Sequence, residues 1–147
     1  MQIGELFLWD EFPYPKDGNP KPRLFIFLGK SSIFFPPIIY YIATFTSQTK
    51  YYELHGKREK NTIVKFKQEE FNLDSESVID LDNDIYDFIT ENEFNNNENI
   101  RVICKISNEK LKLIYEKLLI TGISKQIKID IHYCLNSIGI IGLRRPK

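Results

Sequence analysis

The sequence lacks the usual features of a secreted, membrane-spanning or metal-binding chain. Its two cysteines, Cys104 and Cys134, have no CxxC-like spacing and no histidine cluster beside them. A disulfide framework, a redox motif and a zinc site are therefore not expected, and no metal or other cofactor is predicted. No basic start leads into an apolar run, and the most apolar stretch, residues 32–45, is interrupted by Pro36 and Pro37. We therefore expect a cytoplasmic protein with no membrane span.

The chain also lacks a net charge, because 20 Lys and Arg residues balance 20 Asp and Glu residues. The charges are nevertheless unevenly distributed. Residues 69–98 hold eleven acidic side chains and no Lys or Arg, whereas residues 99–147 hold ten Lys and Arg against three acidic residues. Such an asymmetry can bind a polyanion on one face while the acidic segment faces a basic partner, or the acidic segment can be a solvated loop.

Aromatic and aliphatic residues are abundant. Eleven Phe and eight Tyr contribute to a hydrophobic share of 42% in 147 residues. This length suits one hydrophobic core, and large aromatic residues favour strands. The composition therefore predicts a single, mostly β domain over residues 1–147.

The pattern of apolar residues predicts several strands. Continuous apolar runs at residues 23–29 and 38–46 favour buried central strands, and a turn-rich segment precedes the first of them. The acidic and then Asn-rich residues 82–99 predict a loop or an irregular insertion. The other expected strands are residues 3–12, 49–55, 62–66, 77–81 and 100–106.

The C-terminal third predicts helices. Residues 108–120 place apolar side chains at helical spacing, with Ser107 as an N-cap and Gly122 where a C-cap belongs. Residues 124–136 carry both a strand-like and a helix-like apolar pattern, and we favour a helix. The glycines of the following tail disfavour regular structure. The apolar positions of the first helix are Leu111, Ile114, Tyr115 and Leu118.

Four sequence blocks stand in order along the first 85 positions, and residues 106–118 follow them as a closing helix. Together these blocks resemble the MazF/PemK family of toxin endoribonucleases. The chain departs from that pattern where Leu24-Phe25 replaces the usual Pro-Ala, at the insertion 82–99, and after Leu119. The blocks are Gly4 with WDEFPYP, RLFIFLG from Arg23, Thr46-Ser47-Gln48 after IIYYIA, and TIVKFKQEEFNLDSESVIDLDND.

This resemblance implies an α+β fold with a small SH3-like barrel of the CcdB and MazF type. Residues 1–119 would form the barrel core and its closing helix, and residues 120–147 would be an extra C-terminal extension. The family also implies a homodimer whose RNA groove is blocked by an antitoxin protein.

Cleavage of RNA without a metal requires a positioned 2′-hydroxyl, a group that stabilises phosphate charge, and proton transfer to the leaving oxygen. The resemblance assigns the phosphate to Arg23, whose planar fork donates two hydrogen bonds. It assigns to Thr46 a hydroxyl that holds a phosphate oxygen or orients the nucleophile. Asp82 is the candidate base, with Asp80 as its substitute if the register shifts by two residues.

Further residues are expected to bind RNA. Ser47 and Gln48 stand beside Thr46. Lys16 and Lys21 lie in the turn-rich segment of residues 13–22, the first loop, where they can attract backbone phosphates.

Ordinary structural roles stay open for several of these residues. Arg23 can be a surface residue at a strand edge, Thr46 a simple β-former, and the aspartates part of a solvated turn. Trp9 can stack on a base, but a place in the core fits its apolar neighbours better. His55 and His132 lie outside the matching blocks, so we assign them to structure or surface.

The predicted function is that of a toxin of a toxin-antitoxin system, a metal-independent endoribonuclease that cleaves single-stranded RNA. A CcdB-like gyrase poison is a first alternative, but the expected Trp-Gly-Ile end is missing and the only tryptophan is Trp9. A second alternative is a barrel that binds RNA or protein without cleaving.

Overall fold

The computed structural model describes residues 1–19 and 21–147. This part of the chain contains seven strands, three α-helices and two short 3₁₀ helices, which confirms the predicted α+β class. The strands are β1 (Glu5–Trp9), β2 (Arg23–Lys30), β3 (Ile39–Thr44), β4 (Ile63–Phe66), β5 (Ser77–Asp80), β6 (Ile85–Thr90) and β7 (Ile100–Lys105). The helices are η1 (Thr49–Tyr52), η2 (Glu70–Asn72), α1 (Glu91–Phe94), α2 (Asn108–Leu118) and α3 (Lys125–Ser137).

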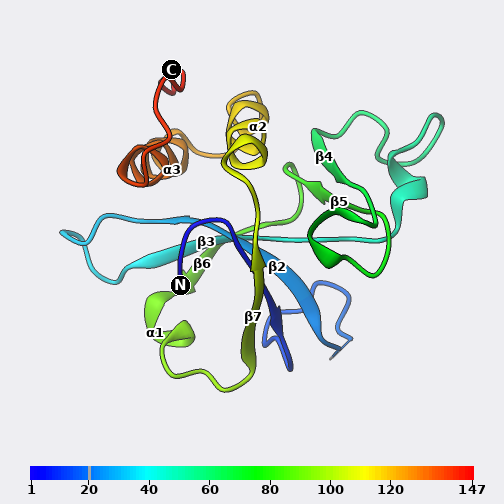
Figure 1. Ribbon diagram of the computed structural model, residues 1–147, viewed down its shortest axis with the longest axis horizontal. Coiled ribbons are helices and arrows are strands. Elements are labelled where there is room, and N and C mark those ends of the chain that lie inside the picture. The colour runs from blue at the N-terminus through cyan, green and yellow to red at the C-terminus, as the bar shows by residue number, and fades with distance from the viewer. Residues whose placement is uncertain (20) are drawn as a thin grey trace.

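Five strands form one antiparallel sheet in the order β6-β3-β2-β1-β7, and β4 pairs with β5 in a separate hairpin (Figure 1). A single bridge between Thr46 and Val78 joins the chain after β3 to β5. Within the described residues β6 and β7 do not pair with each other, so the sheet is open and the expected closed barrel is not seen.

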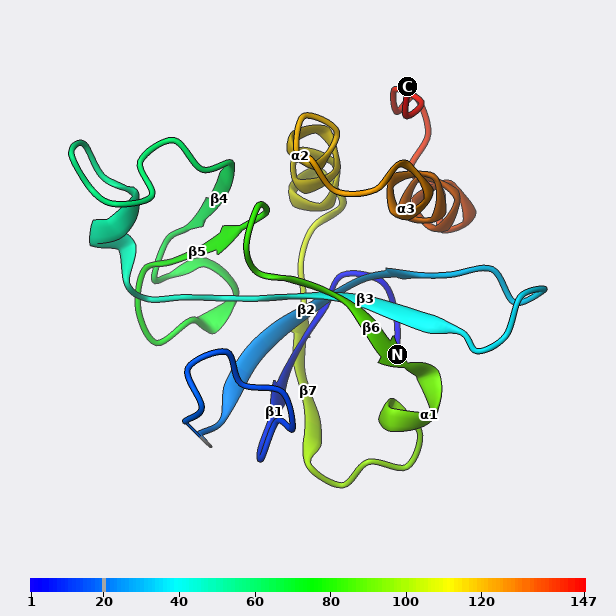
Figure 2. The same ribbon diagram turned by 180° about the vertical axis from the view of Figure 1, so that it is seen from behind.

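The sheet is buried on both faces over its central strands. Alternate residues of each strand point to opposite faces, and each set joins its own core cluster. Leu6, Ile26 and Ala43 belong to one core cluster, and their neighbours Phe7 and Phe25 belong to the other. The first cluster packs under α2, α3 and the β4-β5 hairpin, whereas the second is covered by α1 and the first loop (Figures 1 and 2). This two-sided burial explains the continuous apolar runs of β2 and β3.

The helices follow the sequence pattern. The Ser107 side chain caps α2 by accepting a hydrogen bond from the backbone N–H of Lys110, as predicted, and the four apolar positions expected of this helix are buried. The helix expected at residues 124–136 is confirmed as α3. The helix α2 ends at Leu118, so the predicted C-cap at Gly122 is wrong.

Residues 120–147 contribute to the main hydrophobic core. Ile127, Ile131 and Leu135 of α3 are buried against the sheet, and Ile140 and Leu143 of the tail join the same cluster. The C-terminal segment therefore shares its core with the strands. No helix in the described part of the chain has both the length and the apolar composition needed to cross a membrane.

Two segments have a secondary structure other than the one predicted from the sequence. Residues 49–55 form η1 and turns instead of a strand, because Tyr52 is buried and its hydroxyl is held by Asp80 at 2.9 Å. Residues 82–99 are not an irregular insertion, since they contain β6 and α1. Tyr86 and Ile89 of β6 face the core while Asp87 points outward, and this mixture hid the strand in the sequence.

Candidate functional site

A cavity of about 350 Å³ gathers most of the residues predicted for the site. We call it the polar pocket. The first loop, the start of β2, the segment after β3 and the turn between β5 and β6 build its walls. Six of the seven predicted site residues line it, namely Lys16, Lys21, Arg23, Thr46, Ser47 and Gln48.

Arg23 stands at the first position of β2, opposite Trp9 of β1. Its guanidinium donates hydrogen bonds to the Asp17 carboxylate and, at 2.9 Å, to the backbone carbonyl of Asn19. The side chain is only 16% exposed, and its Nε is buried without a hydrogen-bond partner among the described residues. Because buried donors are nearly always paired, this orphaned N–H is an exception and leaves Arg23 with unused hydrogen-bonding capacity.

Thr46 is fixed by its backbone. Its N–H and carbonyl exchange hydrogen bonds of 2.9 Å with Val78 of β5, and its Oγ1 accepts a hydrogen bond from Gln48 N at 3.2 Å. The hydroxyl still carries its own proton and can donate it. Ser47 and Gln48 are exposed at the rim.

Asp82 is the predicted site residue that the structure does not bring to the polar pocket. Its carboxylate accepts a hydrogen bond from Thr62 N at 2.7 Å, and it lines a different cavity near Thr121. Its substitute Asp80 is fully buried and accepts hydrogen bonds from Tyr52, Asn61 and the following turn. Asp80 is therefore a structural anchor and not part of a solvated turn.

Asp84, in the same turn as Asp80 and Asp82, lines the polar pocket, and the sequence did not single it out as a base. It is 8% exposed, and its Oδ1 lies 3.9 Å from Lys16 Nζ. Burial, reinforced by the nearby charge of Asp80, raises its pKa to about 6. The sequence could have pointed to Asp84 only through its closeness to Asp82, which it follows by two residues in the same acidic turn.

Arg58 is a second residue that the sequence did not reveal. It lines the polar pocket and its Nη1 lies 3.2 Å from the Tyr52 hydroxyl, to which it donates a hydrogen bond. The Tyr52 hydroxyl in turn donates to Asp80. No motif surrounds Arg58, so only the fold connects it to the site.

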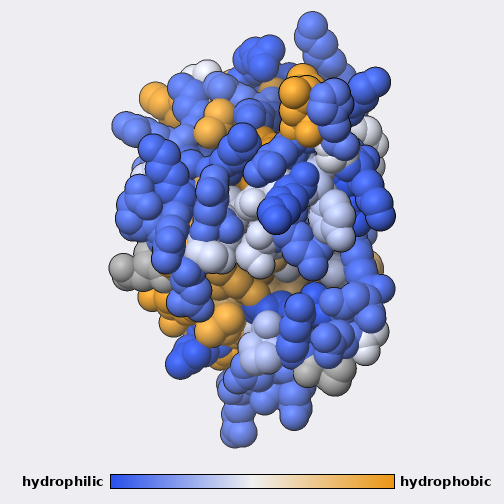
Figure 3. Space-filling model, turned by 90° about the vertical axis from the view of Figure 1, so that its right-hand side faces the viewer, coloured by the Kyte–Doolittle hydropathy of each residue, from blue (hydrophilic) through white to orange (hydrophobic). Residues whose placement is uncertain are grey.

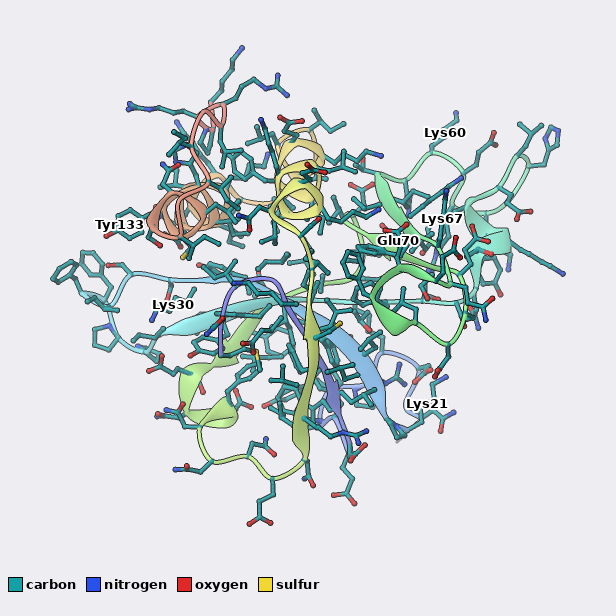
Figure 4. All side chains as sticks on the ribbon, viewed as in Figure 1. Lys21, Lys30, Lys60, Lys67, Glu70 and Tyr133 are labelled. Atoms are coloured by element: carbon teal, nitrogen blue, oxygen red, sulfur yellow. The ribbon has the colours of Figure 1, made fainter. Side chains whose placement is uncertain are left out.

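The polar pocket has an excess of positive charge. Four cationic side chains, from Lys16, Lys21, Arg23 and Arg58, meet the carboxylates of Asp17 and Asp84. In Figure 4 the labelled Lys21 lies beside the start of β2. This balance suits a polyanion. Among the described residues, no cluster of three or more His, Cys, Asp or Glu side chains could hold a metal ion.

Trp9, His55 and His132 all lie outside the polar pocket. Trp9 is 2% exposed and packs edge-on against Phe12, which confirms the core assignment. His55 is exposed in a turn. His132 of α3 lies beside Tyr115, with 5.7 Å between the centroids of their rings. Neither histidine lines the polar pocket.

Comparison with known proteins adds no family, since neither a model of a protein family nor a curated protein matches this sequence. The geometry of the polar pocket therefore carries the functional inference.

Proposed function

We propose that this protein is the toxin of a toxin-antitoxin system, an endoribonuclease that cleaves single-stranded RNA in the polar pocket without a metal ion. The observation that carries this proposal is the convergence of distant chain segments on one cationic cavity. That cavity contains an orphaned guanidinium N–H at Arg23 and a carboxylate, Asp84, whose pKa of about 6 suits proton transfer near neutral pH.

In this mechanism Arg23 and Arg58 hold the scissile phosphate. A guanidinium stays charged at all relevant pH values and presents parallel N–H donors that match two phosphate oxygens. Thr46 donates its hydroxyl proton to a phosphate oxygen from a rigid backbone position. These donors stabilise the extra negative charge of the five-coordinate phosphorus, which is the largest demand of the reaction.

Asp84 and Lys16 transfer the protons. The Asp84 carboxylate takes the proton of the 2′-hydroxyl while that oxygen attacks the adjacent phosphorus. The bond from phosphorus to the 5′-oxygen breaks, and Lys16, 3.9 Å from Asp84, gives a proton to that oxygen. The products are a 2′,3′-cyclic phosphate and a 5′-hydroxyl end. Asp84 thus takes the role that the sequence resemblance gave to Asp82.

The proposed function also includes a fold type, an oligomeric state and a protein partner. We propose a barrel of the MazF type that is completed in a homodimer, and an antitoxin that blocks the polar pocket. An antitoxin segment that replaces RNA among four cationic side chains should carry acidic residues. It should also be disordered until bound.

The test is incubation of the purified protein with end-labelled single-stranded RNA in EDTA. Arg23→Ala and Thr46→Ala are compared with Lys60→Ala, a matched change of an exposed lysine in the loop before β4 (Figure 4). We expect cleavage by the wild type and the Lys60→Ala variant, and a loss of about 100-fold or more in the other two.

Circular dichroism of each variant establishes that it is folded. If the wild type binds the RNA and leaves it intact, the cleavage proposal fails and a non-cleaving RNA-binding protein remains. If the wild type does not bind RNA at all, the cleavage proposal and the hypothesis of a non-cleaving RNA-binding protein both fail.

A further inference from the structure

A second cavity, of about 600 Å³, lies between the β1-β7 edge of the sheet and the segment that leads into β5. We call it the apolar groove. Figure 3 looks at the side of the molecule that carries β4 and β5 and shows a patch of apolar side chains between two largely polar regions. Most of the groove's wall is apolar, with Leu8, Leu24, Phe45, Phe71, Leu73, Val102 and Ile103.

The apolar groove adjoins the polar pocket. Four residues line both cavities, namely Pro22, Leu24, Phe45 and Ser47. A ligand held by its phosphate in the polar pocket therefore reaches the apolar groove with its neighbouring part. Single-stranded RNA has the matching composition, because each charged phosphate is followed by a base with two apolar faces.

Phe71 provides a fixed aromatic surface in the groove. Its φ of 56° lies in the left-handed region, which is an outlier for a bulky residue. The Cys104 thiol lies 3.5 Å from the Phe71 carbonyl, to which it donates a hydrogen bond, and the ring of Phe66 packs against the Phe71 ring at 6.1 Å. The hydrogen bond fixes the backbone at Phe71, and the Phe66 contact orients the Phe71 ring, which can stack on a base.

The rim of the groove carries groups that can read the edge of a base. Asp74 is exposed at this rim, so its carboxylate is open to a ligand. An ionised carboxylate only accepts hydrogen bonds. Guanine offers two adjacent donors on its Watson–Crick edge, cytosine and adenine offer one amino group, and uracil offers a single N–H. Arg101, also at the rim, can hold the next phosphate.

We infer that the apolar groove is a nucleobase subsite for the base next to the scissile phosphate, with Phe71 as its stacking surface and Asp74 as the residue that selects guanine. This inference rests on the proposed function, because the polar pocket must hold the adjoining phosphate. It adds the residues that determine sequence preference.

The test is a binding measurement that does not depend on cleavage. Fluorescence anisotropy is recorded with labelled uridine hexamers that carry 2′-O-methyl groups and therefore lack the nucleophile. One central position holds guanosine, cytidine, adenosine, uridine or an abasic residue. We expect guanosine to bind about tenfold more tightly than uridine, and the abasic hexamer to bind most weakly.

Substitutions in the apolar groove test whether the base preference arises there. Asp74→Asn should remove most of the guanosine preference, and Phe71→Leu should lower the affinity of every base-containing hexamer toward that of the abasic one. Val102→Ser changes the opposite wall at a residue that is 48% exposed, so it tests the same groove with little risk to folding. Phe34→Ala removes a ring that is 82% exposed and lines neither cavity, and it should change nothing.

The outcomes separate the two proposals. Equal affinity for all five hexamers overturns the subsite and leaves the groove to another occupant, such as a segment of a protein partner. No binding of any hexamer overturns the proposed function itself. A guanosine preference that survives every groove substitution places base recognition elsewhere and also overturns the inference.

Discussion

Lys16 of the first loop and Asp84 of the turn between β5 and β6 lie 3.9 Å apart, although 67 residues separate them in the chain. The Lys16 ammonium also donates a hydrogen bond to the backbone carbonyl of Asn83 and lies over the ring of Tyr86. The first loop is thereby tied to the turn whose Asp84 carboxylate lines the polar pocket. The catalytic roles proposed for both residues depend on this contact.

The first prediction concerns the pH dependence of cleavage. Asp84 must be ionised to accept the proton of the 2′-hydroxyl, and its pKa is raised to about 6. The rate should therefore rise with pH up to about 6 and level off above it. Single-turnover rates from pH 4.5 to 8 measure this profile, and Asp84→Asn should abolish the rise. A rate that does not change across this range in the wild type would exclude Asp84 as the base.

The second prediction concerns stability. Because the folded protein binds the Asp84 proton more tightly than the unfolded chain, with a pKa of about 6 against 3.8, ionisation of Asp84 destabilises the fold. The contribution is absent below pH 4 and complete above pH 6. Relative to the wild type, Asp84→Asn should gain roughly 3 kcal/mol in unfolding free energy between pH 4 and pH 7. Urea unfolding of both proteins at several pH values checks this, and a constant difference would refute it.

The third prediction separates the neighbouring aspartates. Asp82→Ala should leave cleavage unchanged and cost about 1 kcal/mol, because it loses one hydrogen bond to Thr62. Asp80→Ala should cost about 3 kcal/mol or more, since it removes the buried acceptor of several donors. Urea unfolding and the cleavage assay are run on both. A large loss of cleavage in a folded Asp82→Ala variant would restore Asp82 as the base.

The fourth prediction concerns residues 120–147. Ile131→Ala should destabilise the protein by about 2–5 kcal/mol, because Ile131 is 2% exposed in the main core. Ile129→Ala, in the same helix but 41% exposed, should change stability by about 0.5 kcal/mol or less. Thermal unfolding of the matched pair is the measurement. Similar values for the two variants would show that α3 is not part of the core.

Local sequence patterns predicted the secondary structure correctly where one physical cause dominated. The central residues of β2 and β3 are apolar because both faces of the sheet are buried there, and α2 shows a clear 3.6-residue period with a capping serine. Arg23 and Thr46, which the order of blocks assigned to one site, both line the polar pocket, and their function there stays a prediction.

Other features depend on tertiary contacts and could not be predicted. The strand β6 was hidden because Asp87 and Phe88 face outward within a strongly acidic stretch. The choice between Asp82 and Asp84 depends on the turn that Asp80 organises through its hydrogen bonds. Arg58 reaches the polar pocket from a segment with no recognisable motif.

The most direct test of RNA cleavage in the polar pocket is analysis of product ends by mass spectrometry, with RNA that carries a single 2′-deoxy residue at the mapped cleavage position. The wild type in EDTA should convert the all-ribose RNA into a 2′,3′-cyclic phosphate and a 5′-hydroxyl end, and it should leave the deoxy position intact. Cleavage at the deoxy position, or 5′-phosphate ends, would contradict the mechanism.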